Sequence, residues 1–292
     1  DCPNLDKCPR AGQNAGMNRR TERPQGQPTR GKTARNRLRR VDSFLILYDS
    51  GLIRRRTGDY ARACYVDVGF GAEPFTTLES AARLRRVNPD LVVIGVEIDP
   101  ERVANAAPYA DDRTFFRLGG FNLPLAADES VRIVRAFNVL RQYDEDAVMT
   151  AWPIMGRGLL PGGLLIEGTS DPLGRILTAN VLRRAPDRLV YEGLLFSTNF
   201  RWGFEPGMFQ PVLPKNCIHR MIPGEKANDF MSAWNQTIRE TVAFKEWGLR
   251  QWFAASAHAL AAQGYRVEQR RSYLRRGYLL WKDSPGPREV AL

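Results

Sequence analysis

The chain has 292 residues, of which 43% are hydrophobic, and it carries a formal net charge of +11. This length and composition allow one large domain or two small ones with a sizeable core. No apolar run approaches the roughly 18 residues of a membrane span, no signal-peptide pattern is found, and four scattered cysteines argue against a disulfide framework. We therefore expect a soluble, cytoplasmic protein that does not enter a membrane.

The positive charge is concentrated in the first fifth of the chain. Residues 1–56 contain 14 Lys and Arg against 5 Asp and Glu, whereas residues 57–292 contain 29 against 27. Such a segment can bind nucleic acid or another polyanion, or can be a solvated tail. Residues 1–33 are rich in Gly, Pro, Gln and Asn, which predicts a flexible basic segment. The basic run 35–40 then merges into an amphipathic helix, which favours packing beside the body over a free arm.

The next part of the chain alternates between strand-like and helix-like patterns. The expected strands are 64–68, 91–98, 114–118, 131–137 and 159–168, with helices at 74–87, from Pro100 onward and at about 145–158. The second of these strands is almost continuously apolar, as in a parallel sheet that is covered on both faces. This alternation predicts an open, doubly wound α/β sheet with right-handed crossovers.

The alternation stops after Asp171. Residues 172–243 contain one more strand-like run, 189–197, and we interpret them as an insertion on the substrate side of the fold. A long helix is expected at about 245–262, and two strand-like runs within 265–281 predict an antiparallel C-terminal hairpin. The predicted organisation is thus a flexible segment, 1–33, followed by one domain, 34–292.

The turn after the first strand, "VDVGFGAEP" (66–74), carries the first chemical signal. Gly69 and Gly71 allow the backbone to turn tightly and to approach a ligand closely. The dinucleotide fingerprint needs a third glycine where Pro74 stands, which argues against a nicotinamide-dependent enzyme. Asp67 would repel a pyrophosphate, but it suits a ligand that carries an ammonium group.

The second signal is the acidic residue in "GVEIDP", at the end of the second strand. Glu97 lies 26 residues beyond Gly71, and a carboxylate there can accept two hydrogen bonds from a ribose diol. Asp99, directly before Pro100, is the better candidate for the N-cap of the next helix. The two signals together predict a ligand that contains adenosine.

With these residues the chain resembles the class I S-adenosylmethionine-dependent methyltransferases. Five stretches match in the family's order over residues 60–170: "VDVGFGAEP", "GVEIDP", "LGGFNLPLAADES", "VRIVRAFNVLRQY" and "LLPGGLLIEG". The resemblance implies a Rossmann-like, seven-stranded sheet whose last strand is antiparallel, and it implies S-adenosylmethionine as the cofactor. The loop after the third strand departs from the family pattern, because Gly-Asp is replaced by Gly119-Gly120 followed by Phe121.

The resemblance also implies roles for individual residues. Asp67 would pair with the ammonium of the donor, and Glu97 would accept hydrogen bonds from its ribose. Ile98 and Phe121 would lie beside the adenine. The implied cofactor-binding set is Asp67, Gly69, Phe70, Gly71, Glu97, Ile98, Gly120, Phe121 and Asn138. Because ligands bind at the carboxyl ends of strands in such sheets, we expect Arg141 and Tyr143 to face the methyl acceptor as catalytic residues.

The acceptor itself is not specified by these motifs. Methyl transfer from a sulfonium depends mainly on positioning, and a base is needed only if the acceptor must lose a proton. We predict a small-molecule acceptor; the alternatives are an RNA methyltransferase that binds through the basic segment, and a non-catalytic nucleic-acid-binding module. Cys217 and His219 have no second pair at zinc-like spacing, so no metal site is expected. The oligomeric state is open.

Overall fold

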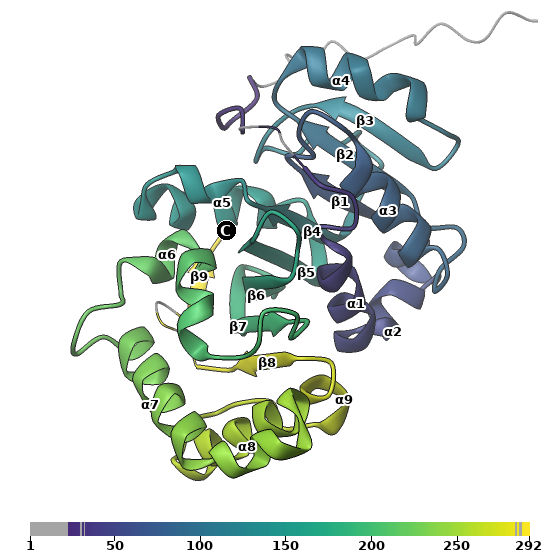
Figure 1. Ribbon diagram of the computed structural model, residues 1–292. Coiled ribbons are helices and arrows are strands. Elements are labelled where there is room, and N and C mark those ends of the chain that lie inside the picture. Colours follow the sequence, from purple (N-terminus) through teal and green to yellow (C-terminus); the bar gives the residue numbers. More distant parts are fainter. Residues whose placement is uncertain (1–22, 30, 32, 284, 286–287) are drawn as a thin grey trace, which may run out of the picture.

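The computed structural model describes residues 23–29, 31, 33–283, 285 and 288–292 (Figure 1). Within these residues the core is one nine-stranded sheet with the order β3-β2-β1-β4-β5-β6-β7-β8, and β9 pairs with β7. The strand order reverses between β1 and β4, so the sheet has the switch point at which α/β proteins place ligands.

The first half of the sheet is parallel. It consists of β1 (Cys64–Val68), β2 (Val93–Glu97), β3 (Thr114–Leu118), β4 (Val131–Phe137) and β5 (Leu159–Ser170). Every residue of β1, β2 and β4 is buried, which explains why these strands are mostly apolar rather than alternating between apolar and polar residues. All five strands lie where the sequence predicts them.

The second half of the sheet is antiparallel. β6 (Ile176–Arg184) pairs with β5, β7 (Arg188–Thr198) pairs with β6, and β8 (Tyr278–Trp281) pairs with β7. β9 (Glu289–Ala291) pairs with the start of β7. The strand-like run predicted at 189–197 is confirmed as β7.

Helices cover both faces of the sheet. One face packs against α1 (Arg39–Tyr48), α2 (Ser50–Arg54), α3 (Phe75–Leu84) and the short α9 (Arg271–Leu274). The other face packs against α5 (Glu145–Gly156) beside the parallel strands, and against α6 (Lys215–Ile218), α7 (Lys226–Glu240) and α8 (Leu249–Ala262) beside the antiparallel ones (Figure 1).

The remaining helices are short. α4 (Pro100–Ala106) packs on β2 and β3, and its N-cap is Asp99, as expected, whose side chain accepts from the amides of Glu101 and Arg102. The 3₁₀ helices are η1 (Gly58–Ala61), η2 (Ala107–Tyr109), η3 (Leu140–Gln142), η4 (Pro206–Val212) and η5 (Val242–Trp247). In the described part of the chain, no helix has the length and apolar character needed to cross a bilayer.

The predicted α/β class with a parallel core and antiparallel C-terminal strands is confirmed, with two differences of detail. The described residues form nine strands rather than seven, and the antiparallel neighbour of β5 is β6 rather than a strand from 265–281. Of the expected hairpin, only 278–281 is a strand; Val267 makes one isolated bridge to Trp281, and 271–274 form α9.

The turn after β5 explains this difference. The Asp171 carboxylate accepts from the amides of Arg175 and Ile176, at 2.6 and 2.8 Å, and Gly174 has φ +64°. Such a tight, side-chain-bonded turn sends the chain straight back along β5. Residues 176–198 of the expected insertion therefore belong to the sheet, whereas a substrate-side role for the rest of 172–243 stays a prediction.

Candidate functional site

The carboxyl ends of β1 and β2 carry the glycine turn and the acidic residue predicted from the sequence. Gly69 and Gly71 have φ angles of +74° and +88°, a region that L side chains rarely adopt. A side chain at Gly69 would also collide with Val139, and one at Gly71 with the carbonyl of Gly31. Both glycines are therefore required by the backbone and by the space around them.

Glu97 is bound directly to this glycine turn. Its side chain is 1% exposed, and Oε2 accepts from the Gly71 amide at 2.9 Å. Oε1 accepts from the Ile98 amide at 3.0 Å and lies 3.7 Å from the Arg102 guanidinium. The carboxylate is thus held by backbone donors and a nearby cation, which offset the cost of burying its charge.

Three further predicted residues complete the walls of a small pocket with Gly69 and Glu97. Ile98 lies on one side, and Gly120 and Phe121 lie on the loop after β3. The Phe121 ring packs against Tyr143, with 5.5 Å between ring centroids and a tilt of 59°. Burial raises the pKa of the Tyr143 hydroxyl, so this side chain stays a neutral phenol at the pocket wall.

Two predicted residues of the glycine turn do not face the pocket. Phe70 is 1% exposed and packs edge-on against Phe116, at 5.3 Å between centroids. Asp67 is 2% exposed, and its carboxylate accepts from Arg135 at 2.7 and 3.0 Å and from Thr77 at 2.8 Å. The structure turns both side chains into the core rather than toward a ligand.

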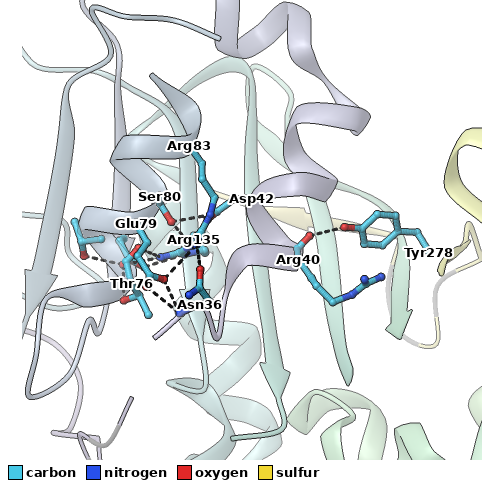
Figure 2. A network of polar contacts seen from close by, with 11 residues as sticks. Asn36, Arg40, Asp42, Thr76, Glu79, Ser80, Arg83, Arg135 and Tyr278 are labelled. Carbon is cyan, nitrogen blue, oxygen red and sulfur yellow. Dashed lines mark hydrogen bonds and ion pairs between the residues drawn. The ribbon is translucent and has the colours of Figure 1, made fainter. Parts of the chain in front are cut away.

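The Asp67 contacts belong to a buried cluster that joins β1, β4, α1 and α3. Figure 2 shows its centre, where the Arg135 guanidinium reaches Asp42 of α1 at 2.8 Å as well as Ser80 of α3 at 2.6 Å. Burial alone would lower the pKa of Arg135, but the charges of Asp67 and its other neighbours outweigh burial and raise it. The Arg135 guanidinium therefore stays charged, and the cluster braces β1, β4, α1 and α3 behind the glycine turn.

Asn138 and Arg141 lie on the loop after β4, outside the pocket lining. Asn138 has φ +60°, and its side-chain oxygen accepts from the Ser170 amide at 3.0 Å, which ties the ends of β4 and β5 together. Arg141 donates from Nη1 to the carbonyl of Leu213, at 3.1 Å. Neither side chain lines the pocket that contains Glu97. The predicted site residues therefore form two groups, those that line the pocket and those on a neighbouring rim made by the loop after β4.

The sequence predicts that residues 1–33 are flexible, but a part of this segment fills the pocket. Gln25, Gly26, Gln27 and Thr29 line it together with the residues above, and the volume left is about 20 Å³. Arg102 was also missed, although its Nη2 donates to the carbonyl of Thr29 at 2.8 Å. Residues 1–22 of the predicted flexible segment lie outside the described residues, whereas 23–29 lie against the body.

A second, wider cavity lies beside α5. It has a volume of about 680 Å³ and borders Leu123, Thr150 and Pro153. Among the described residues that line it, Arg157 is the only one with an ionisable side chain. No three His, Cys, Asp or Glu side chains of the described residues come together as a possible metal site.

Comparisons with known proteins give structural neighbours but no sequence relatives. No protein-family profile matches the sequence, and neither does any curated protein. The solved structures that match include magnesium protoporphyrin IX methyltransferase (ChlM) from Synechocystis PCC 6803 with bound SAH, with 16% identity, a TM-score of 0.33 and coverage of 46% of this chain and 54% of that one.

Two other neighbours are similar in extent. The citrinin polyketide synthase CMeT domain has 16% identity, a TM-score of 0.32 and coverage of 38% and 30% of the two chains. N-methyltransferase NodS from Bradyrhizobium japonicum WM9 has 17% identity, a TM-score of 0.28 and coverage of 37% and 58%. The chain spans less than two thirds of each structure, so its function has to be argued from its own residues.

Proposed function

We propose that the protein is a class I S-adenosylmethionine-dependent methyltransferase. The observation that supports this most directly is the 2.9 Å hydrogen bond between the Gly71 amide and the Glu97 carboxylate. This bond connects a glycine turn, whose backbone lies in the left-handed region, to an acidic residue on the neighbouring parallel strand. Both groups lie at the carboxyl ends of the strands. This combination suits an adenosine ligand that needs close backbone approach and a ribose-binding acid.

The pocket chemistry fits the donor in detail. Each carboxylate oxygen has two acceptor positions, so the oxygens of Glu97 that accept from backbone amides can also accept from a ribose diol. Ile98 and Phe121 supply apolar contacts on the adenine side, and the backbone at Gly69 and Gly120 has no Cβ to obstruct the ligand. When bound, the cofactor would supply a methyl group on a sulfonium, which is a good leaving group.

For Asp67 we propose a positioning role in place of direct ligand contact. Both of its oxygens accept from Arg135, and the threonine hydroxyls at the start of α3 add further bonds. The carboxylate therefore fixes the end of β1 against α3, and in this way it holds the glycine turn between the two elements in place. A ligand ammonium would be met by other groups of the turn, such as backbone carbonyls.

Tyr143 and Arg141 remain our candidates on the acceptor side. The Tyr143 hydroxyl is at the pocket wall, within hydrogen-bond reach of the backbone of Gln27. Arg141 connects the rim to the segment that follows η4, through the carbonyl of Leu213. Their chemistry is the orientation of an acceptor, and the raised pKa of Tyr143 makes its neutral hydroxyl a hydrogen-bond donor rather than a base.

We propose a small-molecule acceptor, because three arginines of the basic run 35–40 are engaged within the protein. Arg35 lies over the Phe75 ring at 4.0 Å, and Arg37 donates to Ser170 Oγ at 3.0 Å. Arg40 donates to Ser197 Oγ at 2.7 Å. Side chains held in this way are poor candidates for phosphate contacts, which disfavours the RNA alternative.

Titration calorimetry with three ligands tests the proposal. The expected result is binding of S-adenosylmethionine and S-adenosylhomocysteine but not of NAD. Binding of NAD alone would overturn the assignment, since it would require the pyrophosphate contacts that Pro74, in place of the third glycine, disfavours. A second titration with short RNA at two salt concentrations separates the acceptor classes: submicromolar, salt-sensitive binding would favour RNA.

A further inference from the structure

The described N-terminal residues form a strap across the pocket, which we define as residues 23–29 and 31 without residue 30. Main-chain atoms hold the strap. The Gln25 carbonyl accepts from the Phe121 amide, and the Gly31 carbonyl accepts from the Ala72 amide, both at 2.9 Å. The Gln27 carbonyl accepts from Gln142 Nε2 at 3.1 Å. The strap therefore binds to the loops after β1, β3 and β4 at the same time.

Gly26 lies at the centre of the pocket. A Cβ atom built on it would be 3.5 Å from Ile98 Cδ1, 3.6 Å from Phe121 Cε2 and 3.1 Å from the Tyr143 hydroxyl. A Cβ on Gly120 would collide with the carbonyl of Gln25. The strap is thus inserted between the side chains and backbone that form the apolar walls, rather than lying over the pocket mouth.

The space left beside the strap excludes a nucleoside. The remaining volume is about 20 Å³, which is enough for about one water molecule, whereas pockets for small ligands are typically 300–1,000 Å³. A ligand that reaches Glu97, Ile98 and Phe121 must therefore displace Gly26 and its neighbours. The strap and such a ligand cannot occupy the pocket together.

We infer that the strap is an autoinhibitory segment that competes with the methyl donor for the nucleoside pocket. This inference rests on the function proposed above. It assigns regulation to the same site: a donor binds only to the fraction of molecules in which the strap has left. The apparent affinity for the donor is then reduced by that fraction.

The composition of the strap suits reversible insertion. Gly26 and Gly31 have φ angles of +135° and +77°, so these positions favour glycine. The contacts to the strap are mostly single hydrogen bonds at exposed or partly exposed positions, each of which contributes little net stability. On displacement, Arg102 loses its bond to the Thr29 carbonyl but stays beside Glu97, so the donor side of the pocket remains assembled.

Two substitutions in the full-length chain test the competition. Gly26→Leu places a side chain where Ile98, Phe121 and Tyr143 already meet, and should expel the strap. Gly224→Leu is the matched control, because Gly224 also has positive φ, at +88°, but nothing lies within 4 Å of its Cβ position. The measurements are the Kd for S-adenosylhomocysteine by calorimetry and amide hydrogen exchange of residues 23–29 and 119–122 by mass spectrometry.

The expected result is that Gly26→Leu binds S-adenosylhomocysteine about tenfold more tightly than the wild type, while Gly224→Leu matches the wild type. Saturating ligand should also speed amide exchange of residues 23–29 in the wild type. Equal Kd values for Gly26→Leu and wild type, or slower exchange of the strap with ligand, would overturn the competition and make the strap a cover that closes on the donor.

A separate outcome identifies failure of the function itself. If neither the wild type nor Gly26→Leu binds S-adenosylhomocysteine, the donor assignment is wrong and the competition falls with it. Hydrogen exchange still reports whether the strap is seated in that case, because Gly26→Leu should then speed exchange at the Phe121 amide, whose bond to Gln25 it breaks.

Discussion

Two regions of the sheet bury carboxylates, and they differ in the groups that surround the buried acid. At the ends of β1 and β2, Asp67 faces the Arg135 guanidinium, and Glu97 accepts from backbone amides with Arg102 nearby. In the middle of β5, Glu167 is 1% exposed and accepts from the neutral Asn180 amide, at 2.8 Å.

The two regions consequently differ in how the buried charge is compensated. In the Arg135 cluster, guanidinium nitrogens lie 2.8 Å from the Asp42 carboxylate and 2.7 Å from the Asp67 carboxylate. Burial raises the pKa of Glu167 to about 7, and the hydrogen bond from Asn180 only partly opposes this. Each buried acid near the proposed donor site thus has a cation beside it, whereas Glu167, beside α6, has a neutral partner and a pKa that makes it respond to pH.

The largest expected effect comes from removing the cation of the first region. Arg135→Met leaves Asp67 buried without its cation and leaves Asp42 paired with Arg83 alone, which should lower the free energy of unfolding by about 3–5 kcal/mol in chemical denaturation. Arg113→Met is the control: its side chain is 42% exposed and pairs only at the surface, so a loss below about 1 kcal/mol is expected. Equal losses of unfolding free energy in the two variants would show that the Arg135 cluster stabilises the fold no more than a surface ion pair does.

The second region should respond to pH instead. An unfolded glutamate titrates near 4.5 and Glu167 near 7, so between these values the native state holds the extra proton and stability falls as pH rises. Glu167→Gln, which keeps the neutral form, should match the wild type at about pH 4 and exceed its free energy of unfolding by about 3 kcal/mol at pH 8.

A control with the opposite sign accompanies this variant. The hydrogen bonds from Arg117 lower the pKa of Glu129, so its contribution is present above the unfolded pKa and is lost as pH falls through the folded value. Glu129→Gln should therefore be less stable than wild type at pH 7, with the difference shrinking in acid. A pH-independent effect of Glu167→Gln would show that Glu167 is ionised throughout.

A smaller effect is expected from neutralising the second acid of the first region. Glu97→Gln keeps the shape of the side chain but weakens its charge-assisted acceptors, so affinity for S-adenosylhomocysteine should fall by about 1–2 kcal/mol in calorimetry. Glu101→Gln, at an exposed position on α4, should bind as the wild type does. Loss of stability without loss of affinity would make Glu97 a purely structural residue.

The smallest effect is expected within the polar cluster around Glu167. The Tyr191 hydroxyl donates to Asn180 Oδ1 at 2.9 Å, and Tyr191→Phe removes this buried bond at a cost of about 1 kcal/mol. Thermal denaturation measures it against Tyr109→Phe, whose side chain is 49% exposed and should leave the midpoint unchanged. If the Tyr191 variant also leaves it unchanged, Asn180 is satisfied without the tyrosine.

Local sequence patterns were sufficient for most elements of the fold. The five parallel strands follow from apolar runs, and α3 and α4 follow from Pro74 and from Asp99 before Pro100. The turn at Gly69 and Gly71 was equally readable, because positive φ angles select glycine at those positions. Each of these signals lies within a few consecutive residues, so the local residue types alone were enough to predict the element.

Tertiary structure alone decided which way the site residues face and what fills the pocket. Asp67 accepts from Arg135, 68 residues away, and the Gln25 carbonyl accepts from the amide of Phe121. Contacts between residues so far apart in the sequence produce no periodic pattern from which they could be predicted. β6 was missed because its pairing with β5 depends on the Asp171 turn and not on a strand pattern of its own. Burial of charge and competition for space are properties of the assembled sheet, and only the packed chain decides them.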